Sequence, residues 1–175
     1  MRIERLNQNH VLSGFDCGIK SLNDWIVNHA HENERRDISR TFVLIDDCEE
    51  VIGYYSLSMG GVNSIDLPRK LGRGLPKYDV GLVLLARLAV ATRSQGQKLG
   101  RDLMIDAIYH AAAAGEHAAA RFIGVDPVDE TARAFYAKFG FQGIDGDERG
   151  RMFLRIDEAL EAFSEASEGE SENPS

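Results

Sequence analysis

Five short apolar stretches in this sequence have the length of β-strands. They cover residues 41–45, 51–59, 82–90, 119–125 and 149–156. The stretch at 82–90 (LVLLARLAV) is almost continuously apolar, which is typical of a strand buried on both faces. The others are bounded by glycine or acidic residues, which favour turns.

Three further segments repeat apolar residues every three or four positions, as amphipathic helices do. The first is expected to begin at Ser21, whose hydroxyl can cap a helix, and the second to end around Gly115. The third is expected to begin at Asp129 or Thr131 and to stop at Gly140. Strands that alternate with helices in this way predict an α/β domain.

The junction between the apolar strand and the second helix is a glycine-rich turn, QGQKLG at residues 95–100. The first turn of a helix has backbone N–H groups without intrahelical partners and carries the positive end of the helix dipole. Gly96 and Gly100 remove side chains where an anion would approach the backbone. A strand, a glycine turn and a helix N-terminus in this order predict a phosphate-binding site.

The formal charge of −8 is unevenly distributed. Seven of the 28 acidic residues lie between Asp157 and Ser175, where there is no Lys or Arg, so the rest of the chain is nearly neutral. The length of 175 residues and the hydrophobic content of 43% fit one globular domain. We expect this domain over residues 1–158 and an acidic, disordered tail over 159–175, which either solubilises the protein or meets a basic surface.

The sequence has no run of about 18 or more apolar residues and no signal peptide at its start, so we expect a cytoplasmic protein that does not enter the membrane. Cys17 and Cys48 are too few for a disulfide framework and lack metal-type spacing. His29 and His31 do not share a helix face, so no metal is expected. Cys17 is either a nucleophile or a small buried residue, and the second is favoured because no partner base is identifiable.

Three motifs resemble those of the GNAT acetyltransferases. The turn Gln95-x-x-Lys98-x-Gly100 is similar to the family's pyrophosphate motif, Gln/Arg-x-x-Gly-x-Gly/Ala, but has lysine at the central glycine. The segment ARAFYAKFGF at residues 132–141 is similar to the family's closing motif. FDCG at 15–18, the Trp25 helix, SRTFVL and VIGYYSLS resemble one branch, the acetyltransferase toxins of type II toxin-antitoxin systems, and this resemblance spans residues 14–141.

The resemblance implies the GNAT fold, which has a mixed central sheet flanked by helices and a strand that splays before the glycine turn to admit acetyl-CoA. Of the residues at the matching positions, the backbone N–H of Val90 would stabilise the oxyanion and Tyr136 would protonate the departing coenzyme A sulfur. The alternative for Tyr136 is a hydroxyl that only finds a partner in the core. The resemblance implies these acetyl-CoA-binding residues: Leu88, Ala89, Val90, Gln95, Gly96, Gln97, Lys98, Leu99, Gly100, Arg101 and Phe135.

The motifs contain no evident general base, and this bears on the acceptor. An α-amine, with a pKa of about 7.7–8, is partly neutral at cellular pH, whereas a lysine amine near 10.4 is almost fully charged. The absence of a base therefore favours an α-amine. The resemblance implies aminoacyl-tRNA as the substrate, whose acetylation blocks translation, together with a cognate antitoxin, commonly a ribbon-helix-helix protein. Dimers are also common in this fold.

Basic residues supply candidate tRNA contacts. The loop at 63–80 carries Arg69, Lys70, Arg73 and Lys77, and Arg35, Arg36 and Arg40 follow the first helix. These residues could contact tRNA phosphates, which would make binding strongly salt-dependent. The alternative is that the loop is a solvated linker.

Two other functions share the same motifs. One is a GNAT enzyme that acetylates a small amine, a peptide N-terminus or a lysine, and the N-terminal motifs argue against it in favour of the toxin branch. The other is a non-catalytic acyl-CoA sensor, which only Lys98 in the glycine motif supports.

Overall fold

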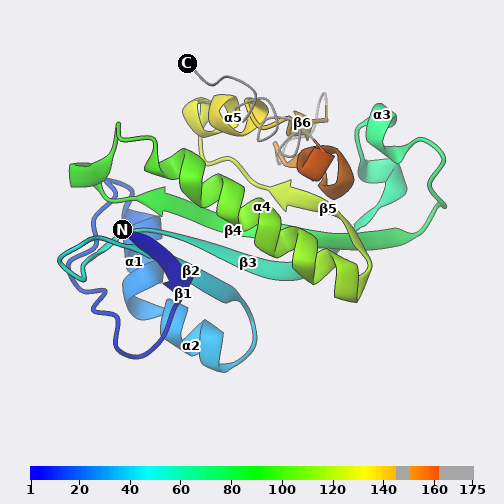
Figure 1. Cartoon of the computed structure of the whole chain (residues 1–175). Helices are drawn as coiled ribbons and strands as arrows, with labels where there is room; N and C mark the ends of the chain where they lie inside the picture. Colours follow the sequence, from blue (N-terminus) through cyan, green and yellow to red (C-terminus); the bar gives the residue numbers. More distant parts are fainter. Residues whose placement is uncertain (145–149, 162–175) are drawn as a thin grey trace, which may run out of the picture. The chain divides into compact units, whose positions relative to one another are not determined.

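The computed structural model describes residues 1–144 and 150–161, and its strands follow the order β1-β2-β3-β4-β5-β7-β6 in one sheet (Figure 1). The strands are β1 Arg2–Arg5, β2 Arg40–Ile45, β3 Val51–Asn63, β4 Asp79–Val90, β5 Ala120–Val125, β6 Gln142–Gly143 and β7 Met152–Arg155. The helices are α1 Lys20–Asn28, α2 Ala30–Arg35, α3 Arg69–Gly72, α4 Leu99–Ala118 and α5 Glu130–Ala137, with 3-10 turns η1 Ser64–Asp66 and η2 Thr92–Ser94. The α/β class expected from the sequence is confirmed.

The chain divides into two units. The first combines residues 1–58 with 85–107, and the second combines 59–84 with the described residues from 108 onward. The strands β3 and β4 therefore contribute one half to each unit. The glycine turn belongs to the first unit, and α5 belongs to the second.

An aromatic cluster fills one side of the first unit. β2 pairs antiparallel with both β1 and β3, and Val43 lies across from Tyr54. Trp25 of α1 stacks on Tyr54, with ring centroids 5.8 Å apart, and Phe15 meets Tyr54 edge-on at 5.3 Å. Aromatic pairs of this kind stabilise a core beyond the area that they bury. They fix α1 and the loop before it against the sheet.

On the opposite side of the same strands, Tyr55 connects the sheet to α4. Its hydroxyl donates to Asp106 Oδ2 at 2.5 Å, and burial together with this carboxylate raises the pKa of Tyr55. Gly53 lets the helix approach, because a Cβ there would lie only 2.9 Å from Leu103 Cδ1. These contacts hold the N-terminal half of α4, and with it the glycine turn.

The second unit is built on the pairing of β5 with β7, in which Phe122 lies across from Arg155. Gly81 of β4 lies so close to the next strand that a Cβ there would be 2.7 Å from Ala119 O. The buried residues of the core, drawn from β3, β4, β5, β7 and the 63–80 loop, are Val62, Leu67, Leu71, Leu82, Phe122 and Phe153. Two of these, Leu67 and Leu71, anchor the basic loop.

Several element boundaries differ from the expectations. α1 begins at Lys20 after Ile19, with no side-chain cap, so the prediction that Ser21 caps it is wrong. α4 continues past Gly115 to Ala118, because Gly115 serves packing: a Cβ there would lie 2.8 Å from Ala120 O. Asp129 caps α5 as expected, accepting from the Ala132 N–H at 2.7 Å.

Two predicted features fall partly outside the described residues. Residues 145–149 include the start of the predicted last strand, and residues 162–175 include most of the predicted tail. The described part of that tail, residues 159–161, is helical. Among the described helices, none has both the length and the apolar character needed to cross a bilayer.

Candidate active site

The turn between η2 and α4 has the geometry of an anion-binding nest. Gly96 and Lys98 both adopt a positive φ, of 79° and 63°. The backbone N–H groups of residues 96–100 have no acceptor among the described residues, and the first helical bonds run from Arg101 and Asp102 to Lys98 O. Successive free N–H groups in such a conformation, at the start of a 20-residue helix, form a concave site for phosphate.

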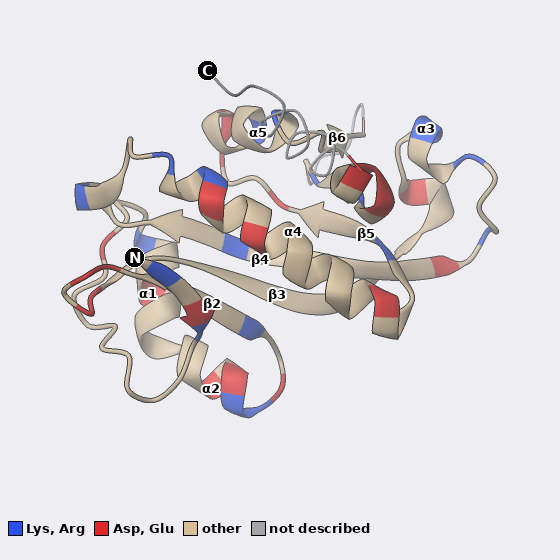
Figure 2. Cartoon of the chain, in the orientation of Figure 1, with Lys and Arg blue, Asp and Glu red and all other residues tan. Residues whose placement is uncertain are grey.

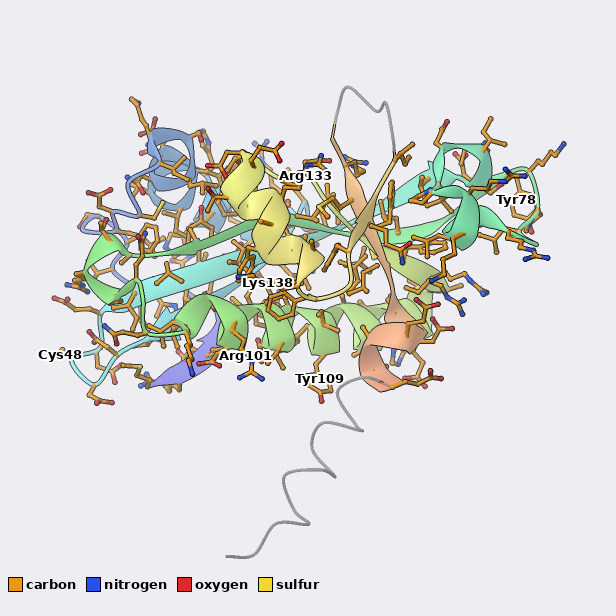
Figure 3. The ribbon with its side chains drawn as sticks, turned by 90° about the horizontal axis from the view of Figure 1, so that it is seen from above. Cys48, Tyr78, Arg101, Tyr109, Arg133 and Lys138 are labelled. Atoms are coloured by element: carbon orange, nitrogen blue, oxygen red, sulfur yellow. The ribbon has the colours of Figure 1, made fainter. Side chains whose placement is uncertain are left out.

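Lys98 takes the backbone conformation that a glycine favours. Its φ of 63° explains why the related motif has glycine at this position. The Lys98 side chain is exposed, as is that of Arg101, which projects outward from the first turns of α4 (Figure 3). Leu99 is 8% exposed and anchors the turn in the core. Two cations therefore flank the nest.

The side chain of Gln95 braces the turn from inside. Its Nε2 donates to Val90 O at 3.0 Å and to Cys17 O at 3.2 Å. Thr92 adds a second connection, since its N–H and its hydroxyl both donate to Asp16 O at 2.8 Å. The end of β4 and the glycine turn are thus tied to the loop at residues 16–18.

That loop is itself ordered by a small polar network. Asp16 Oδ1 accepts from the Gly18 N–H at 2.9 Å and from Asn23 Nδ2 at 2.6 Å, and these bonds lower the pKa of Asp16. Asn23 Oδ1 accepts from the Cys17 N–H at 2.9 Å and lies 3.1 Å from its thiol. Burial raises the pKa of Cys17, so the thiol is not activated as a nucleophile. The structural interpretation of Cys17 is confirmed.

The predicted oxyanion strand runs through Leu88, Ala89 and Val90 at the end of β4. Ala89 packs in the aromatic cluster, whereas Leu88 and Val90 are half-buried. At the position just before Leu88 on the same strand, the Arg87 guanidinium lies over the Trp25 ring, 4.2 Å from its centroid. Sequence reasoning did not single out Arg87, Thr92 or Asp16, because their roles depend on contacts between distant segments.

Tyr136 lies on α5 in the second unit. Its side chain is 7% exposed and contacts Phe135 and Phe141, with ring centroids at 5.4 and 5.7 Å. The hydroxyl has no hydrogen-bond partner among the described residues. It is also not one of the fully buried side-chain oxygens that lack a partner there. Burial raises the pKa of Tyr136 to about 12. The hydroxyl is thus a protonated donor without a partner in the part of the chain that the structure describes.

The structure separates the candidate tRNA contacts into two groups (Figure 2). Arg35 and Arg36 both pair with Glu32, and Arg40 pairs with Asp37, so their charges are offset locally. By contrast, four cations of the loop at 63–80 have neither an ion pair nor a hydrogen bond to any described residue: Arg69, Lys70, Arg73 and Lys77. Among the candidate tRNA contacts, the positive charge that no described acid offsets therefore lies on this loop.

The basic loop at residues 63–80 forms an ordered surface with a hollow. Arg69, Lys70 and Arg73 line a hollow of about 1040 Å³ around α3. Ser64 donates to Pro76 O at 2.6 Å, which closes the loop, and Tyr78 lies at its outer end (Figure 3). The loop is therefore ordered by its own contacts, and whether its cations bind tRNA stays a prediction. Within the described residues, no cluster of His, Cys, Asp and Glu could hold a metal ion.

Comparison with known proteins identifies the fold and the family. A tRNA-acetylating toxin of Mycobacterium tuberculosis (strain ATCC 25618 / H37Rv) is 35% identical over 153 residues, which cover 87% of this chain and 91% of that protein. The structure of AtaT complexed with acetyl-methionyl-tRNAfMet matches with a TM-score of 0.84 and 26% identity, over 93% of this chain and 98% of that one.

A mutant of the AtaT toxin, bound to the C-terminus of the antitoxin AtaR and acetyl-CoA, matches with a TM-score of 0.78 and 26% identity, over 93% of this chain and 97% of that one. The model of the acetyltransferase (GNAT) family matches residues 12–141. This match includes the braced glycine turn and ends at Phe141, beside Tyr136. The chain belongs to the GNAT family of acetyltransferases.

Proposed function

We propose that this chain is a toxin that transfers an acetyl group from acetyl-CoA to the α-amino group of aminoacyl-tRNA. The observation that carries the proposal is the 35% identity to a tRNA-acetylating toxin over 87% of the chain. The acetylated amine can no longer attack a peptidyl ester, so translation stops. We place this activity in the cytoplasm, where aminoacyl-tRNA is used.

The residues of the turn fit the pyrophosphate of acetyl-CoA. The five free N–H groups of residues 96–100 present donors without side-chain obstruction at Gly96 and Gly100. Lys98 and Arg101 add positive charge on the exposed side. Gln95 holds the turn in place, because its Nε2 donates hydrogen bonds to Val90 O and Cys17 O. These bonds already occupy the amide nitrogen.

The chemistry is aminolysis of a thioester. The neutral amine attacks the acetyl carbon, and the oxyanion accepts a hydrogen bond from the Val90 N–H, an interaction worth about 10²-fold or more in rate. The C–S bond then breaks and the electron pair goes to sulfur, which takes a proton from the Tyr136 hydroxyl. The phenolate recovers a proton from the nitrogen as the amide forms. No covalent enzyme intermediate is required.

The raised pKa of Tyr136 suits a donor. A phenol with a pKa of about 12 stays protonated across the physiological range. Its hydroxyl has no competing acceptor among the described residues, so a hydrogen bond to sulfur costs no existing contact. Phe135 and Phe141 restrict the ring through edge contacts.

The free cations of the loop at 63–80 are proposed to contact tRNA phosphates: Arg69, Lys70, Arg73 and Lys77. Arg35 and Arg36, which Glu32 neutralises, are proposed to contribute less. We further propose a cognate antitoxin, of the ribbon-helix-helix type, and a homodimer. The antitoxin complex of the related AtaT toxin supports the first of these.

The test is transfer of labelled acetyl from acetyl-CoA to total tRNA, with and without prior aminoacylation. The proposal predicts label on the charged pool alone, and resolving the pool by amino acid identifies the acceptor. Label on uncharged tRNA, or transfer only to free amines or lysine peptides, would refute it. The Tyr136→Phe variant is the matched control for enzyme-dependent transfer.

A further inference from the structure

Arg87 is half-buried, and no described acidic residue pairs with its positive charge. It has no hydrogen bond or ion pair with any described residue, and its guanidinium lies over the Trp25 ring. Burial lowers its pKa, and no Asp or Glu opposes that effect. The other half-buried arginines that the structure describes all have polar partners: Arg40 with Asp37, Arg133 with Gly150 O, Arg151 with Asp126 and Arg155 with Asp157.

The position of Arg87 on the sheet follows from the strand register. Ala91 N–H donates to Ile52 O at 2.8 Å, and β3 leaves the first unit where β4 enters it, so the two strands are antiparallel. Moving two residues along each strand from this pair places Ala89 across from Tyr54. This agrees with the presence of both residues in the aromatic cluster. The next step places Arg87 across from Ser56.

This row of the sheet is polar, unlike the row beside it. Ser56 lies across from Thr41 of β2, and both hydroxyls are fully buried without a hydrogen-bond partner in the described residues. The neighbouring row of Val43, Tyr54 and Ala89 is entirely part of the aromatic cluster. Arg87 therefore lies where the apolar cluster ends, beside a row in which two buried hydroxyls also lack a hydrogen-bond partner among the described residues.

Arg87 is also close to the predicted reaction centre in the first unit. Val90 lies three positions further along the same strand, a distance of about 10 Å. A half-desolvated guanidinium without an acid is costly to maintain, so its position favours a ligand anion. On aminoacyl-tRNA the carboxyl group is esterified and neutral. The anion nearest to the reacting amine is therefore the phosphate of the terminal nucleotide.

We propose that Arg87 binds the 5′-phosphate of the 3′-terminal nucleotide of the acceptor and so positions the aminoacyl amine. This inference rests on the proposed function for the identity of the acceptor. The ring of Trp25 would hold the guanidinium plane in place, and the planar fork would donate two hydrogen bonds to phosphate oxygens. Arg87 is thus a determinant of specificity for nucleotide-linked amines over free ones.

A binding test does not depend on turnover. Trp25 is the one tryptophan in the chain, so its fluorescence reports on ligands at Arg87. With the protein saturated with coenzyme A, adenosine 5′-monophosphate should give a saturable change, and adenosine, which has the same absorbance, should give none. Arg87→Met keeps an apolar stem over the ring and should abolish the response. Equal responses to both ligands, or a response retained by Arg87→Met, would refute the phosphate site.

A kinetic test uses two acceptors that differ by one group, 3′-aminoacyl-adenosine with and without a 5′-phosphate. The wild type should prefer the phosphorylated acceptor in kcat/KM by about tenfold or more, the value of a charge-assisted hydrogen bond. Arg87→Met should lose this preference and leave the KM for acetyl-CoA unchanged, whereas Arg87→Lys should retain part of it. Ser56→Ala, in the same row, should keep the preference.

The outcomes separate the two proposals. If Arg87→Met lowers activity on both acceptors equally, Arg87 is a structural residue and the phosphate site is refuted, while the proposed function stands. If the wild type acetylates neither acceptor but does acetylate another amine, the proposed function fails, and the fluorescence titration alone decides the phosphate site.

Discussion

The side chain of Gln95 donates to the carbonyl oxygen of Cys17 at 3.2 Å, and this bond joins segments that are 78 residues apart. The same amide nitrogen donates to Val90 O at 3.0 Å. The N-terminal loop at residues 16–18 thus supports both the end of β4 and the glycine turn. The FDCG segment is therefore joined through its backbone to the turn that we propose as the cofactor site.

Gln95→Ala should weaken acetyl-CoA binding without unfolding the protein. The variant loses two hydrogen bonds of an exposed side chain, together worth about 1–2 kcal/mol, so we expect the KM for acetyl-CoA to rise by about five- to thirtyfold. Gln8→Ala is the control for the substitution itself, because the Gln8 side chain is exposed, makes no hydrogen bond to a described residue and lies outside the proposed acetyl-CoA site. An unchanged KM in Gln95→Ala would show that the brace does not matter.

Lys98→Gly should stabilise the fold. At a φ of 63° a side chain costs about 1 kcal/mol or more, and glycine removes that cost. A gain of 1 kcal/mol corresponds to a rise in Tm of about 2–4 °C for a domain of this size. Lys98→Ala removes the same charge but keeps the strain, and thermal unfolding should rank it below Lys98→Gly. The reverse order would contradict the left-handed geometry.

Tyr136→Phe should reduce turnover and leave stability nearly unchanged. The hydroxyl has no partner among the described residues, so its removal breaks no contact there, and the phenylalanine ring can keep the contacts with Phe135 and Phe141. Loss of a general acid typically lowers kcat by about 10²-fold or more. Single-turnover rates at saturating acetyl-CoA measure the effect. Phe139→Leu, in the turn that follows α5, is the control, and full activity in Tyr136→Phe would exclude the acid role.

The pH profile should have a rising limb and no early fall. The rate should increase as the acceptor α-amine loses its proton near pH 7.7–8. The pKa of Tyr136, about 12, is higher than the ordinary tyrosine value of about 10. The hydroxyl therefore keeps its proton, and can donate it, to a higher pH than an ordinary tyrosine does. With a hydrolysis-resistant aminoacyl amide as acceptor, kcat should stay level to about pH 10. A fall below that pH that is absent in Tyr136→Phe would contradict the account.

Neutralising Arg69, Lys70 and Arg73 to Gln should weaken tRNA binding and flatten its salt dependence. Each lost phosphate contact lowers the slope of log K against log salt by about 0.7–0.9. The KM for acetyl-CoA should not change, because none of these residues belongs to the proposed acetyl-CoA site. Arg35→Gln with Arg36→Gln is the comparison, and it should have a smaller effect because Glu32 offsets both charges. Equal slopes for the two sets would argue against the loop.

The parts of the fold that local sequence determines were predicted well. The apolar run at 82–90 forms the greater part of β4, and Asp129 caps α5 as its side chain suggested. The need for a glycine-like backbone in the turn was visible in the motif and is confirmed at Gly96 and Lys98. β1 was missed, because four residues with an alternating polar pattern carry little signal alone.

The contacts between distant segments could not be predicted from one sequence. Nothing local to Gln95 indicates that its side chain reaches Cys17, and nothing local to Arg87 indicates that it lies over Trp25. The difference between Arg69 and Arg36 depends on whether an acid lies within reach, which a charge count does not show. The roles of Tyr136 and the Val90 N–H remain predictions.

The atom that receives the acetyl group distinguishes α-amine acetylation from every other reaction of this enzyme with charged tRNA. Charged tRNA is incubated with acetyl-CoA and the enzyme and then digested to nucleosides, and the aminoacyl-adenosine from its 3′ end is analysed by mass spectrometry with fragmentation. We expect one added acetyl group on the α-nitrogen of the amino acid, in amounts that Tyr136→Phe strongly reduces. An acetyl group on a base or on the ribose, or an unmodified 3′ end while acetyl-CoA is consumed, would contradict it.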